Sequence, residues 1–197
     1  MSKSLFKNLG RVALAAVLAA PIGAYAESDF ETGAGALSAQ ARVDFQITIP
    51  RFLSLRVGTT GAPVDLVSFT VPAANVGDAT AIAGTGGDLG AGSVTARVLG
   101  NGGNVTLQAT TAGPIGNGAA GTISWSQITT ASSNPSLPAP VLANGASAGV
   151  PVAATAGVVN QTATWTYSYA NSAVIESGTY GGVNTNNSRV TYTASLP

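Results

Sequence analysis

The sequence predicts an all-β protein: an antiparallel β-sandwich that follows a cleaved N-terminal signal peptide. Short runs rich in β-branched and aromatic residues alternate apolar with polar side chains, and Gly, Pro and Asn clusters separate them. No stretch beyond the predicted signal has a convincing helical period. With 25 Gly, 10 Pro and only 8% charged residues, the composition is typical of strands joined by tight turns.

The first 26 residues have the pattern of a secretory signal peptide. A basic segment ending at Arg11 precedes the apolar run 12–20, which is too short to span a bilayer. Ala24-Tyr25-Ala26 follows as an A-x-A cleavage site. We therefore expect residues 1–26 to be removed on export to the periplasm, the cell surface or the medium, with no transmembrane segment left in the mature chain.

The charges and missing residue types exclude several functions. Beyond residue 26 the chain has five Arg, no Lys and eight acidic residues, a formal charge of −3. It has no basic patch for nucleic acid. The sequence has no His, the usual metal ligand and general base, and no Cys for disulfides. We expect no enzyme activity, no cofactor and no metal centre.

The mature chain begins with a leader and a long alternating segment. Residues 27–36 are acidic and then Gly/Ala-rich, which predicts a flexible leader to a single domain over 37–197. Between residues 37 and 49 every second residue is apolar, which predicts a strand that ends at Pro50. Its large apolar side chains form a candidate strand-pairing face: Val43, Phe45, Ile47 and Ile49.

The strand-pairing face has two alternative partners. Burying four such side chains would contribute roughly 6–12 kcal/mol, which is comparable to the stability of a small domain. The face is therefore expected to be covered. Either the segment is the first strand of its own sandwich, or it completes the sheet of a neighbouring molecule by strand addition.

The remaining elements follow from local patterns along the chain. Asn-Gly in the turn 100–103 supplies the positive φ angles that a tight hairpin needs. The four prolines of residues 131–157 predict an irregular excursion with one short edge strand at 150–153. The predicted elements are strands at 52–58 and 64–72, a glycine loop at 83–92, a hairpin at 93–110, and strands at 121–129, 161–170 and 188–197.

Three aromatic residues form a second candidate site. Trp165, Tyr167 and Tyr169 share one face of a predicted strand. Facing outward, they would be a stacking platform for sugars, and facing inward they would belong to the core. The residues between them are polar, which suits solvent and favours the inward orientation.

Two further patterns give little support for a catalytic or a metal site. Residues 145–149 match G-x-S-x-G around Ser147, but this segment lies in a Pro/Ala/Gly-rich loop. The mature chain has neither the His nor the Lys that would activate the hydroxyl, so we expect no catalytic residue. Asp78 and Asp88 lie in loops, where they would bind calcium with backbone carbonyls or, as the sequence favours, stay solvated.

The termini of the mature chain carry a family resemblance. The stretch "IPRFLSLRVG" (49–58) and the ending "GTYGGVNTNNSRVTYTASLP" (178–197) are similar to a group of uncharacterised secreted bacterial β-sandwich proteins. A cleaved leader, a short extension, an alternating first strand and a final strand also resemble fimbrial subunits of the chaperone–usher type. The Gly-Thr-Tyr turn and Thr-rich last strand are similar to WxL-type surface domains, although no W-x-L triplet follows Trp125 or Trp165.

The resemblance implies an Ig-like or pilin-like sandwich and a structural role. The expected protein is a secreted or cell-surface structural or adhesive protein, such as a pilin-like or biofilm-matrix subunit that assembles by strand addition. Its expected partners are copies of itself or related subunits. The alternative from the aromatic face is a carbohydrate-binding module.

Overall fold

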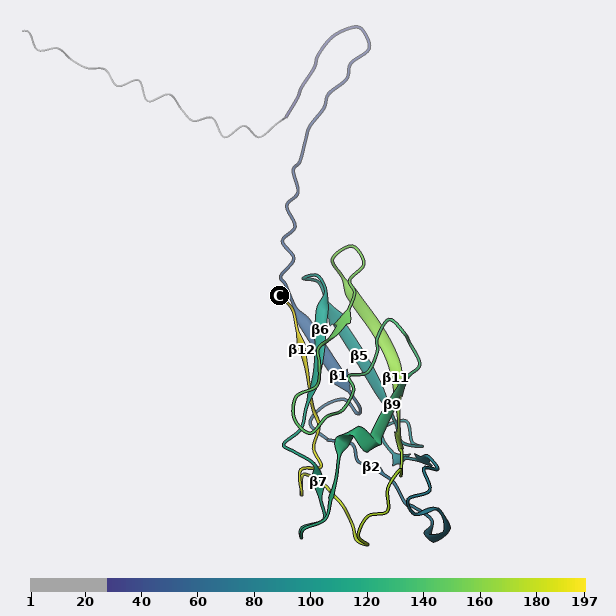
Figure 1. Ribbon diagram of the computed structural model, residues 1–197. Helices are drawn as coiled ribbons and strands as arrows, with labels where there is room; N and C mark the ends of the chain where they lie inside the picture. Colours follow the sequence, from purple (N-terminus) through teal and green to yellow (C-terminus); the bar gives the residue numbers. More distant parts are fainter. Residues whose placement is uncertain (1–27) are drawn as a thin grey trace, which may run out of the picture. The chain divides into compact units, whose positions relative to one another are not determined.

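The computed structural model describes residues 28–197, and the chain divides into two units, Met1–Thr48 and Ile49–Pro197. The predicted signal peptide, 1–26, lies outside the described residues. Figure 1 shows the chain coloured along the sequence, from purple near the N-terminus to yellow at the C-terminus.

The described part of the first unit has no regular secondary structure. Residues 28–48 form neither helix nor strand, and all of them are exposed. The backbone N–H of Ser38 donates to Glu31 at 3.2 Å, so local side chains satisfy part of the backbone. The strand predicted at 37–49 is not formed in the single chain, because no other described segment pairs with it.

The second unit is all-β and its strands pair antiparallel. A five-stranded sheet has the order β1-β5-β11, with β3 and β9 both paired to β11. A three-stranded sheet has the order β10-β6-β12, and two-residue strands form the pairs β2-β4 and β7-β8. The strands are β1 (Leu53–Val57), β2 (Val67–Ser68), β3 (Ile82–Ala83), β4 (Thr85–Gly86), β5 (Ser93–Gly100), β6 (Val105–Thr110), β7 (Ile115–Gly116), β8 (Thr122–Ile123), β9 (Ile128–Ser132), β10 (Val150–Val152), β11 (Val159–Tyr169) and β12 (Thr191–Ser195).

Several predicted strands are confirmed and two are only partly formed. The strands expected at 52–58, 161–170 and 188–197 correspond to β1, β11 and β12, and the short edge strand at 150–153 is β10. The strand expected at 64–72 is reduced to β2. The 3₁₀ helix η2 (Trp125–Gln127) interrupts the strand expected at 121–129, because the hydroxyl of Ser124 accepts a bond from the Ser126 N–H and starts a turn. A second 3₁₀ helix, η1, spans Ala73–Asn75.

The predicted hairpin at 93–110 is wrong. Its two strands form, but β5 belongs to the five-stranded sheet and β6 to the three-stranded sheet. The turn between them carries the chain from one sheet to the other. Asn101 does not close a hairpin, because its side chain bonds to the backbone of Pro50 and Phe52 instead.

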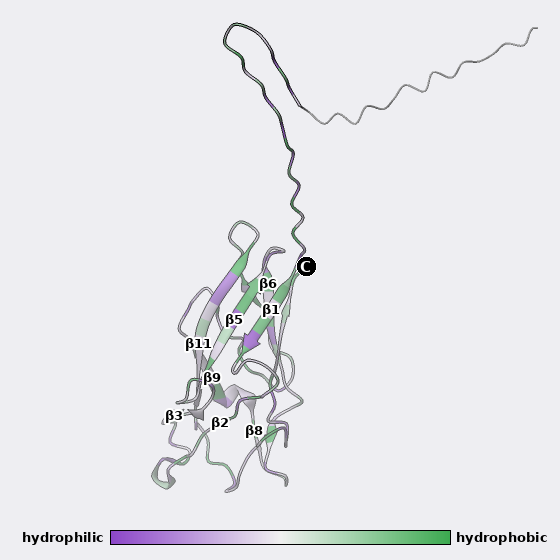
Figure 2. Ribbon diagram, turned by 180° about the vertical axis from the view of Figure 1, so that it is seen from behind, coloured by the Kyte–Doolittle hydropathy of each residue, from purple (hydrophilic) through white to green (hydrophobic). Residues whose placement is uncertain are grey.

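One apolar cluster joins the two larger sheets. Inward-facing residues of β5, β6 and β11 form its centre, and β11 contributes Trp165, Tyr167 and Tyr169. Figure 2 shows β1 largely in the colour of hydrophobic residues, and Leu53, Leu55 and Val57 pack against this cluster. The core therefore reaches the edge formed by β1.

The predicted excursion covers one side of the core. Residues 133–149 connect β9 to β10, each an outer strand of its sheet, and bring Leu137 and Leu142 into the cluster. The indole N–H of Trp165 donates to the Leu137 carbonyl at 3.2 Å. The core is thus closed along β9 and β10.

Candidate functional site

The opposite edges of the two larger sheets are free. Among residues 28–197, β1 pairs only with β5 and β12 pairs only with β6. Each strand therefore presents a row of backbone N–H and C=O groups without a strand partner, which is a template for another strand. The two strands lie near each other, as Figure 1 shows.

The space between β1 and β12 is closed at one end. A β-carbon built on Gly100 would lie 3.3 Å from Leu53 Cδ1 and 3.6 Å from Leu196 Cδ1, so both leucine side chains converge on Gly100. The Arg51 guanidinium also donates to the Pro197 carbonyl oxygen. These contacts hold the start of β1 against the residues that follow β12.

Beyond this narrow end, an apolar groove opens between the end of β1 and the start of β12, and it continues between the loop segments 63–71 and 175–190. Its volume is about 1190 Å³, above the ~300–1,000 Å³ range of small-molecule sites. Loop residues extend it, and Val64 and Val183 keep 64% and 69% of their surface exposed. The strand side chains that line it include Leu55, Val57, Val94, Tyr167 and Tyr192, and Val190, which precedes β12, lies beside them.

Two tyrosines join the sheets inside the groove. The hydroxyls of Tyr167 on β11 and Tyr192 on β12 lie 2.8 Å apart, and the Tyr192 ring lies 5.3 Å from the Trp165 ring. Burial raises the pKa of Tyr167 to about 12, although its bond to Tyr192 partly opposes the shift. Burial and the neighbouring Tyr167 raise the pKa of Tyr192 well above its ordinary value. The pair is a neutral, fixed part of the groove at physiological pH.

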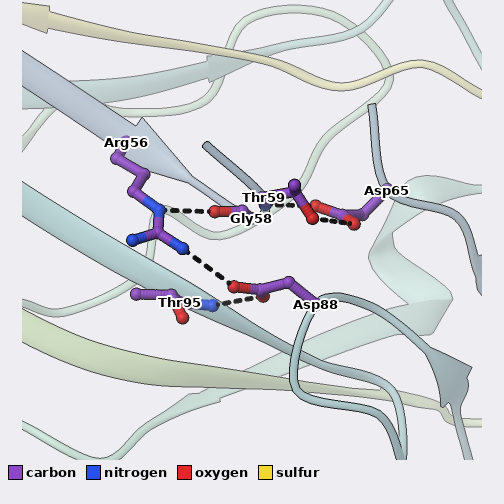
Figure 3. A network of polar contacts seen from close by, with 6 residues as sticks. All are labelled: Arg56, Gly58, Thr59, Asp65, Asp88 and Thr95. Carbon is purple, nitrogen blue, oxygen red and sulfur yellow. Dashed lines mark hydrogen bonds and ion pairs between the residues drawn. The ribbon is translucent and has the colours of Figure 1, made fainter. Parts of the chain in front are cut away.

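A polar network lies where β1 leads into the loop that follows it (Figure 3). Arg56 donates to the Gly58 carbonyl at 2.7 Å and pairs with Asp88 at 3.3 Å. Asp88 also accepts the Thr95 N–H at 2.7 Å. Burial opposes ionisation of Asp88, but the bonds from Thr95 and the charge of Arg56 outweigh it and lower its pKa.

The same network holds the loop that follows β1. The Thr59 N–H and hydroxyl donate to the Asp65 carboxylate at 2.6 and 2.8 Å (Figure 3). Gly58 has φ +86°, and a β-carbon there would clash with Asp65. The loop therefore depends on glycine at 58, and it is held beside the groove.

The candidate strand-pairing face is exposed along its whole length. Val43, Phe45, Ile47 and Ile49 keep 73%, 88%, 84% and 75% of their surface exposed. The sequence predicted this face from the alternation of residues 37–49, and its pairing remains a prediction. The groove residues Leu55, Val57, Val190 and Tyr192 were missed as a site, although the alternation of β1 and β12 marks them as inward-facing.

The predicted aromatic face lies in the core. Trp165, Tyr167 and Tyr169 are all buried, with Trp165 fully inaccessible. A sugar platform needs exposed rings, so these residues do not provide one.

The remaining candidate residues have structural contacts. Ser147 is buried, and its hydroxyl accepts the Ala109 N–H at 3.0 Å and donates to the Ala148 carbonyl at 2.9 Å. Asp78 accepts bonds from Asn75 at 2.9 Å and the Thr80 N–H at 2.8 Å, and these bonds lower its pKa. Within residues 28–197, no group of three or more acidic, His or Cys side chains is arranged to hold a metal ion.

Residues 28–197 contain no helix with the length and hydrophobicity needed to cross a membrane. The chain matches no protein-family model, no curated protein and no solved structure.

Proposed function

We propose that the protein is an exported, non-enzymatic structural subunit that assembles by strand addition. Residues 37–49 of one copy form a strand in the groove between β1 and β12 of the next copy. The observation that carries the proposal is the exposure of Val43, Phe45, Ile47 and Ile49, each at 73% or more, in a chain that also has an open apolar groove. The segment has an exposed apolar face, and the groove is an apolar surface that this face can fill.

The energetics favour pairing of the two surfaces. Burying the four side chains contributes roughly 6–12 kcal/mol as an upper estimate. The seven residues from Val43 to Ile49 span about 20 Å as a strand, which suits the five-residue strands β1 and β12 with their flanks. Backbone hydrogen bonds to the free edges add to the apolar contact.

The proposed fold is a β-sandwich that lacks one strand. The five-stranded and three-stranded sheets would be its layers, with the excursion 133–149 closing one side. The strand supplied by a neighbour would close the other side. Because donor and acceptor are different surfaces of the same chain, such contacts propagate into a linear polymer or close into a ring.

The proposed setting is outside the cytoplasm, as the signal-like residues 1–26 indicate. A pilin-like fibre or a biofilm matrix is the form of assembly that suits a subunit with these two surfaces. A structural role is also supported by Ser147, whose hydroxyl is engaged with the backbone, and by the absence of His from the sequence.

Sedimentation of the chain 27–197 tests the proposal with two charge variants. We expect wild type to form oligomers that grow with concentration. Phe45→Asp places a charge on the buried face and should give monomers, because an unpaired buried charge is strongly unfavourable. Gln46→Asp adds the same charge on the opposite face and should assemble like wild type. Monomeric wild type at every concentration, or assembly of Phe45→Asp equal to wild type, would contradict the proposal.

A further inference from the structure

The structure assigns Asn101 a positioning role that determines which groove residues 37–49 enter. We infer that Asn101 keeps the chain at Pro50–Phe52 extended, so that the segment pairs with a second copy and does not fold back into its own groove. The inference rests on the proposed function, and it concerns the choice between the two partners that strand addition permits.

The Asn101 carboxamide bonds to the backbone on both sides of Arg51. Its Nδ2 donates to the Pro50 carbonyl at 2.8 Å, and its Oδ1 accepts the Phe52 N–H at 2.8 Å. The Asn101 N–H donates in turn to the Phe52 carbonyl at 3.3 Å. From Ile49 to Phe52 the backbone has no turn or bend before β1 begins. We call Pro50, Phe52 and Asn101 the exit clamp.

Arg51 reinforces the exit clamp. Its guanidinium donates to the Gly102 carbonyl at 3.4 Å and to the Pro197 carbonyl. A β-carbon at Gly100 would lie 3.2 Å from the Phe52 carbonyl oxygen, tighter than an ordinary contact. Glycine at 100 therefore lets the turn after β5 lie directly against the residues that precede β1.

Pairing with its own groove would require the chain to reverse. For residues 43–49 to lie beside β1 of the same molecule, Pro50–Phe52 would have to form a three-residue hairpin loop. Such a reversal rotates the Pro50 carbonyl and the Phe52 N–H away from Asn101 and breaks both bonds. It would also place Ile49 at the narrow end, where Leu53 and Leu196 already converge on Gly100.

A strand from a second copy meets neither restriction. It is not tethered to Phe52 of the molecule it enters, so the exit clamp of that molecule stays intact. It also has access to the groove from the wide end, beyond Val57 and Val190. The clamp therefore disfavours self-pairing and leaves pairing between copies unaffected.

The matched pair Asn101→Ala and Asn104→Ala tests the role in the chain 27–197. Asn104 belongs to the same connection, but its side chain accepts the Ala154 N–H at 2.9 Å, far along the chain from residues 50–52. Size-exclusion chromatography separates monomer from oligomer, and hydrogen exchange shows whether the amides of 43–49 are protected. A self-paired monomer is monomeric with protected 43–49 amides, a combination that a merely destabilised chain does not give.

We expect Asn101→Ala to raise the ratio of self-paired monomer to oligomer about tenfold, the factor that follows when two hydrogen bonds of ordinary net strength are lost. Asn104→Ala should match wild type. Asn101→Asp keeps the acceptor for Phe52 but turns a carboxylate oxygen toward the Pro50 carbonyl, which breaks that bond and adds repulsion, so it should also raise the ratio. It replaces Asn101→Ala if that variant does not fold.

Three outcomes separate the clamp from the proposed function. If wild type assembles and neither Asn101 variant changes the ratio, the clamp is wrong and the proposed function stands. If wild type is a monomer with protected 43–49 amides, the chain pairs with itself despite the clamp, and the inference is overturned. If wild type is a monomer with unprotected 43–49 amides, strand addition itself fails.

Discussion

Tyr167 and Tyr192 link the two larger sheets at the level of single residues. They come from β11 and β12, and their hydroxyls share a hydrogen bond of 2.8 Å inside the groove. Burial raises the pKa of both phenols, that of Tyr167 to about 12. The folded state therefore holds these two protons more tightly than the unfolded chain does.

This difference predicts a loss of stability at alkaline pH. A group whose pKa is raised on folding contributes its full stability below the unfolded value, near 10 for Tyr, and loses it as the pH rises toward the folded value. We expect the free energy of unfolding to fall between about pH 10 and pH 12. Urea unfolding followed by tryptophan fluorescence measures it.

The double variant Tyr167→Phe/Tyr192→Phe is the control for this pH dependence. It keeps both rings, including the contact of residue 192 with Trp165, and removes both titrating hydroxyls. Its free energy of unfolding should change much less over the same pH range. An equal decline in the variant would assign the effect to other groups.

Residue-level reasoning from the sequence was strongest where side chains alternate. It favoured an inward position for Trp165, Tyr167 and Tyr169, and all three are buried. It did not find the bonds from Asn101 to Pro50 and Phe52, because contacts between residues about fifty positions apart leave no local pattern.

At the scale of elements, strand patterns were predictable and strand partners were not. The apolar alternation of β5 and β6 identified both strands, and the Asn-Gly turn suggested that they pair. They lie in different sheets because each buries its apolar face in the shared core, and the turn lies against residues 50–52. The Asn-Gly pattern thus predicted where the chain turns, but it did not predict which strands pair with each other.

The free edges of β1 and β12 predict a specific pattern of hydrogen exchange. Along β12, the amides that are not bonded to β6 have no strand partner within the described chain. We expect these amides to exchange rapidly in monomeric Phe45→Asp and slowly in assembled wild type, because the added strand would bond to them.

The central strands give an internal control for that measurement. Both β5 and β11 are paired along both edges over part of their length, so their amides should be protected in monomer and oligomer alike. Equal exchange of the β12 edge in the two states would show that the groove is not where the strand is added.

At the scale of the whole molecule, the chain has an exposed segment of alternating apolar residues and a core that is open along one side. The sequence predicted the segment from its alternation, and it also predicted that the apolar face needs a partner. The groove depends on the distance between β1 and β12, which belong to different sheets and lie at opposite ends of the second unit's sequence. Such a distance follows from tertiary packing and cannot be derived from periodicity.

The most direct test of the account is a titration of the peptide 37–49 into monomeric Phe45→Asp chain. In that variant the groove is intact and the chain's own segment is disabled. We predict saturable one-to-one binding of the wild-type peptide and of its Gln46→Asp form, and no binding of its Phe45→Asp form. A folded Phe45→Asp chain that binds none of the three peptides would contradict the claim that the groove receives this segment.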